Sequence, residues 1–188
     1  MVARHGHPPL WAREPTFQTL VLIILEQQVS LASARAAYRR LEAAVSVVEP
    51  ARVATMSDAA AIAAGLTRQK RGYLSELAAR VLSGELDLDA VAAGPDDAAR
   101  TLLTIVPGIG RWSGDVYLLM ALGRPDVWPI DDIALAASAR AVKRLSRRPS
   151  PDELAQIGKP WRPWRSAAAR LLWHAYLARD RASQREGG

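Results

Sequence analysis

No part of this 188-residue chain shows the run of alternating β-branched residues that marks a β-strand. Glycine and proline instead divide a sequence rich in Ala, Leu and Arg into short segments with helical spacing. Hydrophobic residues make up 49% of the chain and charged residues 23%, values typical of a folded globular protein. We therefore expect an all-α fold, arranged as one domain or as two small lobes that share a cleft.

Helix boundaries are predicted from capping residues and from glycine and proline. Ser30, Ser57 and Thr67 each stand where an N-cap would begin a helix, and Ser150 with Glu153 forms a capping box. The predicted helices cover residues 15–25, 31–45, 58–65, 68–83, 96–105, 111–122, 131–145, a helix starting at 151, and 164–179. We expect the tail, residues 181–188, to fray.

Composition excludes several classes of function. The absence of cysteine excludes disulfides, thiolate catalysis and thiolate-ligated zinc or iron–sulfur sites. The longest apolar run, residues 20–25, is too short to span a membrane, and residues 1–13 do not form a secretory signal, so we expect a cytoplasmic protein. The net charge is +6, and all but three of the 25 basic residues are arginine. The excess of arginine fits a polyanionic partner or, equally, a bias in genomic base composition.

The most informative segment is residues 102–112, where one helix ends, Pro107-Gly108-Ile109-Gly110 forms a turn, and a new helix begins. Glycines let the backbone amides of such a turn point at a phosphate beside the positive end of the next helix. The alternative is a plain tight turn between two helices.

A pair of carboxylates follows this hairpin. Asp131 and Asp132 stand at a helix start after the apolar approach 127–130. Acidic residues in that position are usually caps. If one of the pair is a cap, the other can face a cleft.

The order of these motifs resembles the helix-hairpin-helix superfamily of DNA glycosylases, in which an essential aspartate follows a phosphate-binding hairpin. Segments 24–30, 65–71 and 159–166 are similar to the alkylation-repair branch typified by bacterial 3-methyladenine DNA glycosylase II. The resemblance covers residues 15–178 and implies two helical lobes flanking a cleft. The first lobe would be 14–124, ending in the helix-hairpin-helix motif, and the second 125–180, joined by 1–13. We expect these residues to contain no counterpart of the amino-terminal sheet domain that some members carry.

The resemblance implies a base-excision-repair enzyme that flips out an alkylated purine, such as 3-methyladenine or 7-methylguanine, and hydrolyses its N-glycosidic bond. A buried carboxylate would stabilise the oxocarbenium-like sugar. By register with the family Asp132 takes this role, with Asp131 in reserve as cap or support. Asp115 is a third carboxylate, which we expect to be solvated or salt-bridged.

Tryptophan attracts cationic bases by stacking and by cation–π contact. By position in the family, Trp112 and Trp173 are expected in the base pocket, although large aromatic residues are more often core fillers. Relatives that also cleave the DNA backbone carry a lysine beside the hairpin, where this chain has Trp112. The resemblance therefore implies a monofunctional enzyme without lyase activity.

Further residues are assigned to DNA by the same resemblance. Gln28 would be the wedge that fills the place of the flipped nucleotide, although Gln27 and Gln28 could equally be a helix C-terminus closing on a turn. The expected phosphate-binding residues are Gly108, Gly110, Arg111, Lys70 and Arg165. The basic side chains among them could instead be solvated or cap a neighbouring carbonyl.

No cofactor is expected to be required. Hairpins of this family suggest a structural Na⁺ or K⁺ on the backbone carbonyls of Thr104, Val106 and Ile109. The expected partner is double-stranded DNA containing alkylated bases, bound by a monomer. The alternative function is a non-catalytic helix-hairpin-helix DNA-binding protein. A third interpretation is a basic helical regulator, but the sequence shows no helix-turn-helix pattern.

Overall fold

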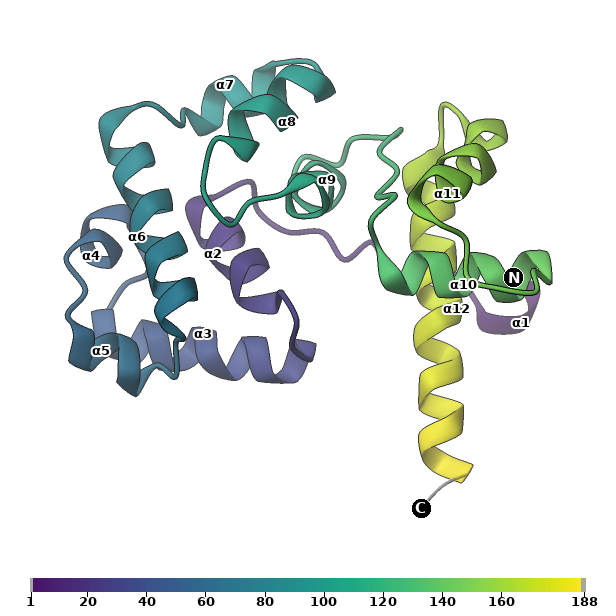
Figure 1. Cartoon of the computed structure of the whole chain (residues 1–188), viewed down its shortest axis with the longest axis horizontal. Helices are drawn as coiled ribbons and strands as arrows, with labels where there is room; N and C mark the ends of the chain where they lie inside the picture. The colour runs from purple at the N-terminus through teal and green to yellow at the C-terminus, as the bar shows by residue number, and fades with distance from the viewer. Residues whose placement is uncertain (1, 187–188) are drawn as a thin grey trace. The chain divides into compact units, whose positions relative to one another are not determined.

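The structure is a computed structural model that describes residues 2–186 (Figure 1). All regular elements in this range are helices, which confirms the predicted all-α class. They are α1 (Val2–His5), α2 (Phe17–Glu26), α3 (Leu31–Val45), α4 (Pro50–Ala54), α5 (Asp58–Ala63), α6 (Arg68–Ser83), α7 (Leu88–Ala93), α8 (Asp96–Thr104), α9 (Arg111–Met120), α10 (Ile133–Lys143), α11 (Pro151–Gly158), the 3₁₀ turn η1 (Lys159–Trp161) and α12 (Arg165–Glu186). None of the described helices is long and apolar enough to cross a membrane.

The helices form two compact units, each with its own core. One unit is Arg13–Leu122, which contains α2 to α9. The other consists of the residues before Arg13 together with those from Gly123 onward, and so contains α1 and α10 to α12.

Helix α2 is the centre of the unit Arg13–Leu122, where it packs against α3, α6 and α9 (Figure 1). Its side chains Leu20, Ile23 and Ile24 are fully buried. Burying each such side chain contributes about 1.5–3 kcal/mol to folding. The same core fixes the start of α9, and with it the glycine hairpin that precedes α9.

In the other unit, α10 lies against α12 and α11. The face of α10 that is buried carries small residues such as Ser138 and Ala139, which allow close approach. Trp128 precedes α10 and donates its indole N–H to the carbonyl of Leu154 at 2.8 Å. A Cβ on Gly158 would overlap this indole, so the position requires glycine.

The predicted caps at Ser30, Ser57 and Thr67 are confirmed, as is the capping box of Ser150 with Glu153. Helices α1, α4 and α7 were not predicted, because four to six residues are too few to show helical periodicity. Helix α12 continues to Glu186, beyond the predicted end at 179. The tail expected to fray is thus helical over 181–186, and residues 187–188 lie outside the described range.

Candidate functional site

Asp132 is the N-cap of α10 and is also buried, with 7% of its surface exposed. Its Oδ1 atom accepts a hydrogen bond from the backbone N–H of Leu135 at 2.6 Å. Asp131 is exposed. We expected Asp132 as the catalytic group and Asp131 in reserve as cap or support. The structure differs in one respect, because the cap is Asp132 itself. The buried carboxylate of the pair therefore sits at the N-terminal end of a helix.

Trp173 holds the same carboxylate from α12. Its indole Nε1 donates to Oδ1 of Asp132 at 3.1 Å, and the side chain is 8% exposed. One oxygen of Asp132 thus accepts from two donors on different helices. These two bonds fix the orientation of the carboxylate, and the expected role of Trp173 as a base-pocket residue stays a prediction.

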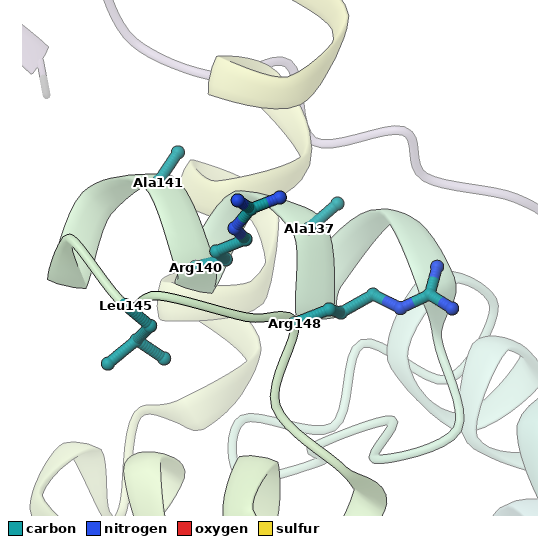
Figure 2. A pocket seen from close by; sticks show the side chains of 5 residues that line it. All are labelled: Ala137, Arg140, Ala141, Leu145 and Arg148. Carbon is teal, nitrogen blue, oxygen red and sulfur yellow. The ribbon is translucent and has the colours of Figure 1, made fainter.

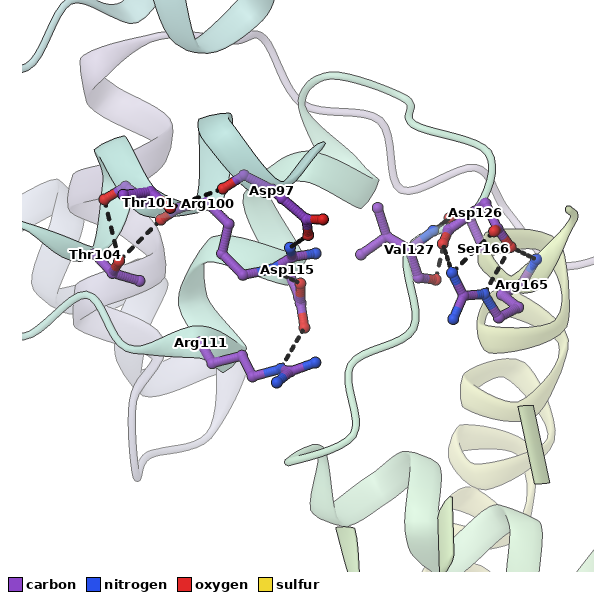
Figure 3. A network of polar contacts seen from close by, with 10 residues as sticks. All are labelled: Asp97, Arg100, Thr101, Thr104, Arg111, Asp115, Asp126, Val127, Arg165 and Ser166. Atoms are coloured by element: carbon purple, nitrogen blue, oxygen red, sulfur yellow. Dashed lines mark hydrogen bonds and ion pairs between the residues drawn. The ribbon is translucent and has the colours of Figure 1, made fainter. Parts of the chain in front are cut away.

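The loop that leads to Asp132 is tied to the start of α12 by Asp126, Arg165 and Ser166 (Figure 3). The guanidinium of Arg165 donates to both carboxylate oxygens of Asp126, at 2.7 and 2.9 Å. These hydrogen bonds hold the pKa of Asp126 below its ordinary value. Ser166 donates to the carbonyl of Arg124 at 2.6 Å and accepts from the N–H of Val127 at 2.9 Å. Arg165, predicted to contact phosphate, has its guanidinium engaged in this clamp.

In the unit Arg13–Leu122, the glycine hairpin has one glycine fixed by packing and one in open space. Gly108 has φ +89°, a conformation that favours glycine, and a Cβ there would overlap the ring of Tyr73. Gly110 is the N-cap of α9 and is exposed, and a Cβ there would meet nothing within 4 Å. The hairpin therefore presents the N-terminus of a ten-residue helix at an exposed turn, which is an arrangement suited to a phosphate.

Arg111 begins α9, and its side chain is 56% exposed. It makes only a long contact, 3.9 Å, to Asp115. Asp115 itself is buried and paired with Arg100 at 2.8 Å, so it is salt-bridged, one of the two states expected for it, and not solvated (Figure 3). Trp112 follows, half-buried. Of the predicted basic phosphate ligands, Arg111 is the one whose position at the hairpin and exposure suit that role.

Gln28 follows the end of α2, and Lys70, on α6, reaches the same place with its ammonium group. Lys70 donates from Nζ to the carbonyls of Leu25 at 2.7 Å and Gln27 at 3.0 Å, which is the carbonyl-capping alternative considered for it. Gln28 is exposed and has φ +59°, so the chain turns sharply at the predicted wedge. The side chain of Gln27 reaches the hairpin, where Nε2 donates to the carbonyl of Gly108 at 2.7 Å.

No described group of three or more His, Asp or Glu side chains could hold a metal ion. The carbonyls of Thr104, Val106 and Ile109 are oxygen ligands of the kind that monovalent cations use. The Val106 carbonyl already accepts from the N–H of Ile109 at 2.9 Å and keeps a second lone pair. The residues are therefore chemically compatible with such an ion.

A pocket of about 600 Å³ lies beside the C-terminal half of α10 (Figure 2). It is lined by Ala137, Arg140, Ala141, Leu145 and Arg148. Figure 2 shows the two guanidinium groups pointing in different directions, and Arg140 donates to the carbonyl of Ser146 at 3.2 Å. The lining contains no acid or nucleophile and none of the predicted site residues, so this pocket is not a candidate catalytic site.

The sequence did not predict the contacts that several residues make at these sites. Gln27 and Tyr73 contact the hairpin, and Asp126 and Ser166 hold the loop before Asp132. Each lies within five residues of a residue that was singled out. Their partners are 39 or more residues away in the chain, apart from the pairing of Tyr73 with the hairpin, so local spacing alone does not find them.

The chain is similar to known proteins over most of its length. A DNA-3-methyladenine glycosylase of Bacillus subtilis is 32% identical over 108 residues, which are 57% of this chain and 36% of that protein. The structure of a DNA-3-methyladenine glycosidase from Bacillus halodurans matches with a TM-score of 0.77 and 31% identity, covering 90% of this chain and 78% of the other. A 3-methyladenine DNA glycosylase of Schizosaccharomyces pombe, in complex with abasic DNA, matches with a TM-score of 0.81, 26% identity and 89% and 84% coverage.

The match to the curated relatives from Bacillus subtilis spans about a third of their length, 36% and 37%. Residues 21–163, most of the chain, match the family described as HhH-GPD superfamily base excision DNA repair protein. The chain therefore belongs to the HhH-GPD superfamily of base excision DNA repair proteins.

Proposed function

We propose that this chain is a DNA glycosylase that removes alkylated, cationic purines from double-stranded DNA by hydrolysing the N-glycosidic bond. The observation that carries this proposal is the carboxylate of Asp132, buried at a helix N-terminus and held by two donors on one oxygen. The similar glycosylases of Bacillus subtilis and Schizosaccharomyces pombe are named for 3-methyladenine, which supports the substrate class.

In the proposed reaction the bond between C1′ of the deoxyribose and N9 of the purine breaks, and the bonding electrons leave with the base. The sugar gains oxocarbenium character, and the carboxylate of Asp132 stabilises its positive charge. The same carboxylate orients the water that attacks C1′ and accepts the proton that this water releases. The purine is a good leaving group because alkylation has already made it cationic. One carboxylate with weak contacts to the base is therefore sufficient, at a cost in selectivity against normal purines.

The hairpin and α9 would bind the phosphate backbone, with Gly108, Gly110 and Arg111 as contacts. Trp112 and Trp173 would face the flipped base, which their indole rings attract by stacking. We further propose that a Na⁺ or K⁺ ion on the backbone carbonyls of Thr104, Val106 and Ile109 has a purely structural role. We also propose that a monomer binds one duplex.

We also propose that the enzyme lacks lyase activity. A lyase needs an amine that attacks C1′ of the sugar. Lys70 is the single lysine of the unit that contains the hairpin, and its amine donates to two backbone carbonyls. The residue beside the hairpin is Trp112, which cannot form a Schiff base.

The test is to incubate the protein with methylated duplex DNA and to identify the released bases by chromatography, with unmethylated DNA as control. We expect 3-methyladenine or 7-methylguanine to appear while the DNA gains alkali-labile abasic sites without direct strand cleavage. If the protein binds the DNA and releases no base, it is the non-catalytic DNA-binding protein that we considered as the alternative.

A further inference from the structure

The loop after α2 carries the predicted wedge, Gln28. Helix α2 ends at Glu26, and Ser30 already caps α3, so three residues reverse the chain. Gln28, in the middle of this loop, has φ +59°, a backbone conformation that non-glycine residues rarely adopt. The last carbonyls of α2 lack partners within their own helix and need donors from elsewhere. An exposed loop of this kind keeps one shape only if other elements hold it.

Lys70 supplies the first support. From the first turn of α6, its ammonium donates to the carbonyls of Leu25 and Gln27, at 2.7 and 3.0 Å. A cation at a helix C-terminus is also favoured by the helix dipole. Burial lowers the pKa of Lys70 below the ordinary lysine value, as expected for an ammonium turned into the protein rather than toward solvent.

Gln27 supplies the second support. Its Nε2 donates to the carbonyl of Gly108 at 2.7 Å and to Oγ of Ser113 at 3.0 Å. Both amide hydrogens are therefore used, one on the hairpin and one on α9. The residue directly before the predicted wedge is thus bonded to the segment predicted to bind phosphate, 81 residues further along the chain.

Tyr73 completes the connection from α6. It lies one helical turn after Lys70, and its ring packs so closely on Gly108 that a Cβ there would overlap it. The same face of α6 therefore contacts the end of α2 through Lys70 and the hairpin through Tyr73. Three segments that are distant in sequence form one cross-linked group, which we call the brace: Gln27, Lys70, Tyr73, Gly108 and Ser113.

We propose that Lys70 and Gln27 are positioning residues that hold the Gln28 loop and the hairpin in a fixed relation, and that Lys70 does not contact DNA phosphate. This rests on the proposed function. The hairpin would bind the phosphate backbone while Gln28 fills the space that the flipped nucleotide leaves. The distance between the hairpin and Gln28 would therefore decide how well the protein holds DNA with its nucleotide flipped out. A misplacement of about 1 Å can cost roughly a hundredfold in rate.

The test uses Lys70→Met and Gln27→Met, which keep most of the side-chain volume and remove the donors. Arg68→Met is the matched control, because Arg68 is an exposed cation on the same helix. Single-turnover rates are measured on 7-methylguanine opposite cytosine and on the same lesion opposite an abasic-site analogue, where no base pair has to be broken. Thermal melting identifies any variant that fails to fold.

We expect both brace variants to lose roughly tenfold to a hundredfold on the paired lesion and much less on the unpaired one, with Arg68→Met close to wild type on both. The double variant should lose less than the product of the two single losses, because both remove the same support. Equal losses on the two substrates would overturn the proposal. So would a fall of about one in the salt slope of DNA binding for Lys70→Met, since that marks a phosphate contact.

Hydrogen exchange on the free protein separates this proposal from the proposed function. We expect Lys70→Met to speed amide exchange both in residues 27–30 and in the hairpin, residues 106–110. Unchanged exchange in the hairpin would overturn the brace even in an active enzyme. If the wild-type protein releases no base, the glycosylase proposal fails, and the exchange result still decides whether the brace exists.

Discussion

At the scale of single residues, one carboxylate combines two tasks. Asp132 caps α10 and is also the proposed catalytic group, and one of its oxygens accepts from Leu135 and from Trp173. A hydrogen bond to a charged group contributes about 1.5–3 kcal/mol. Besides its proposed contact with the base, Trp173 therefore orients the carboxylate of Asp132 through its N–H.

We predict that Trp173→Phe lowers the single-turnover rate of base release by about tenfold or more, because the ring face is kept and the donor to Asp132 is lost. DNA affinity should change little. The matched control is Trp164→Phe, since Trp164 is 66% exposed and donates to no site residue in the described contacts. A variant that binds damaged DNA weakly and yet retains the wild-type rate constant would show that Trp173 acts by stacking alone.

At the scale of elements, the loop before Asp132 depends on its clamp to α12. Asp126 has a lowered pKa because Arg165 hydrogen-bonds its carboxylate. A carboxyl group with a depressed pKa in the folded state adds stability above its ordinary pKa near 3.8, and this is lost as the pH falls through the folded-state value. The clamp is thus stabilising at neutral pH and weakens in acid.

Asp126→Asn should accordingly lower the free energy of unfolding by about 1 kcal/mol at neutral pH. The difference from wild type should shrink as the pH is lowered below 4, because both proteins then carry a neutral side chain. Melting temperatures of the two proteins between pH 7 and pH 2.5 measure this. A difference that stays constant in acid would mean that the charge of Asp126 is not what holds the loop.

Close packing of α11 against Trp128 gives a second test at this scale. Gly158→Ala should destabilise the protein by about 1–3 kcal/mol, because the added Cβ overlaps the indole. Gly72→Ala, on the exposed side of α6 where a Cβ meets nothing, should instead stabilise by about 0.5–1 kcal/mol. Thermal or denaturant unfolding compares the two. If Gly158→Ala is neutral, the indole of Trp128 does not pack against α11 as tightly as the structure shows.

The sequence predicted elements well where they were long or capped by a side chain, as at Ser30, Thr67 and Ser150. Contiguous motifs singled out Gly108 and Asp132, whose roles stay predictions, but they did not show the positive φ of Gly108 or the burial of Asp132. Whether Lys70 faces a phosphate or a carbonyl depends on where α2 ends relative to α6, which is decided by tertiary packing. Arg165 is engaged by Asp126 for the same reason.

At the scale of the whole molecule, the net charge of +6 and the many arginines favour association with DNA. The affinity should fall linearly with salt concentration on a double logarithmic plot. Charge alone does not identify contacts, because several arginines are held within the protein. Arg111 is exposed and suits a DNA contact, whereas Arg165 is paired with Asp126. Comparing the two distinguishes an arginine that contacts DNA from one that is held within the protein.

We predict that Arg111→Gln lowers the salt slope of DNA binding by about one, whereas Arg165→Gln leaves the slope unchanged and lowers the melting temperature. Fluorescence anisotropy with a labelled duplex at several salt concentrations gives both slopes. The reverse pattern would place Arg165, as the sequence first indicated, on the phosphate backbone.

In the proposed reaction the carboxylate of Asp132 drives departure of the base. The most direct measurement is the single-turnover rate of Asp132→Asn against Asp131→Asn on a duplex that carries one 7-methylguanine. Asparagine also caps helices well, so Asp132→Asn keeps the start of α10. We predict a loss of roughly a hundredfold to a thousandfold for Asp132→Asn with intact DNA binding, and a near wild-type rate for Asp131→Asn. An Asp132→Asn protein that releases the base at the wild-type rate would contradict the account.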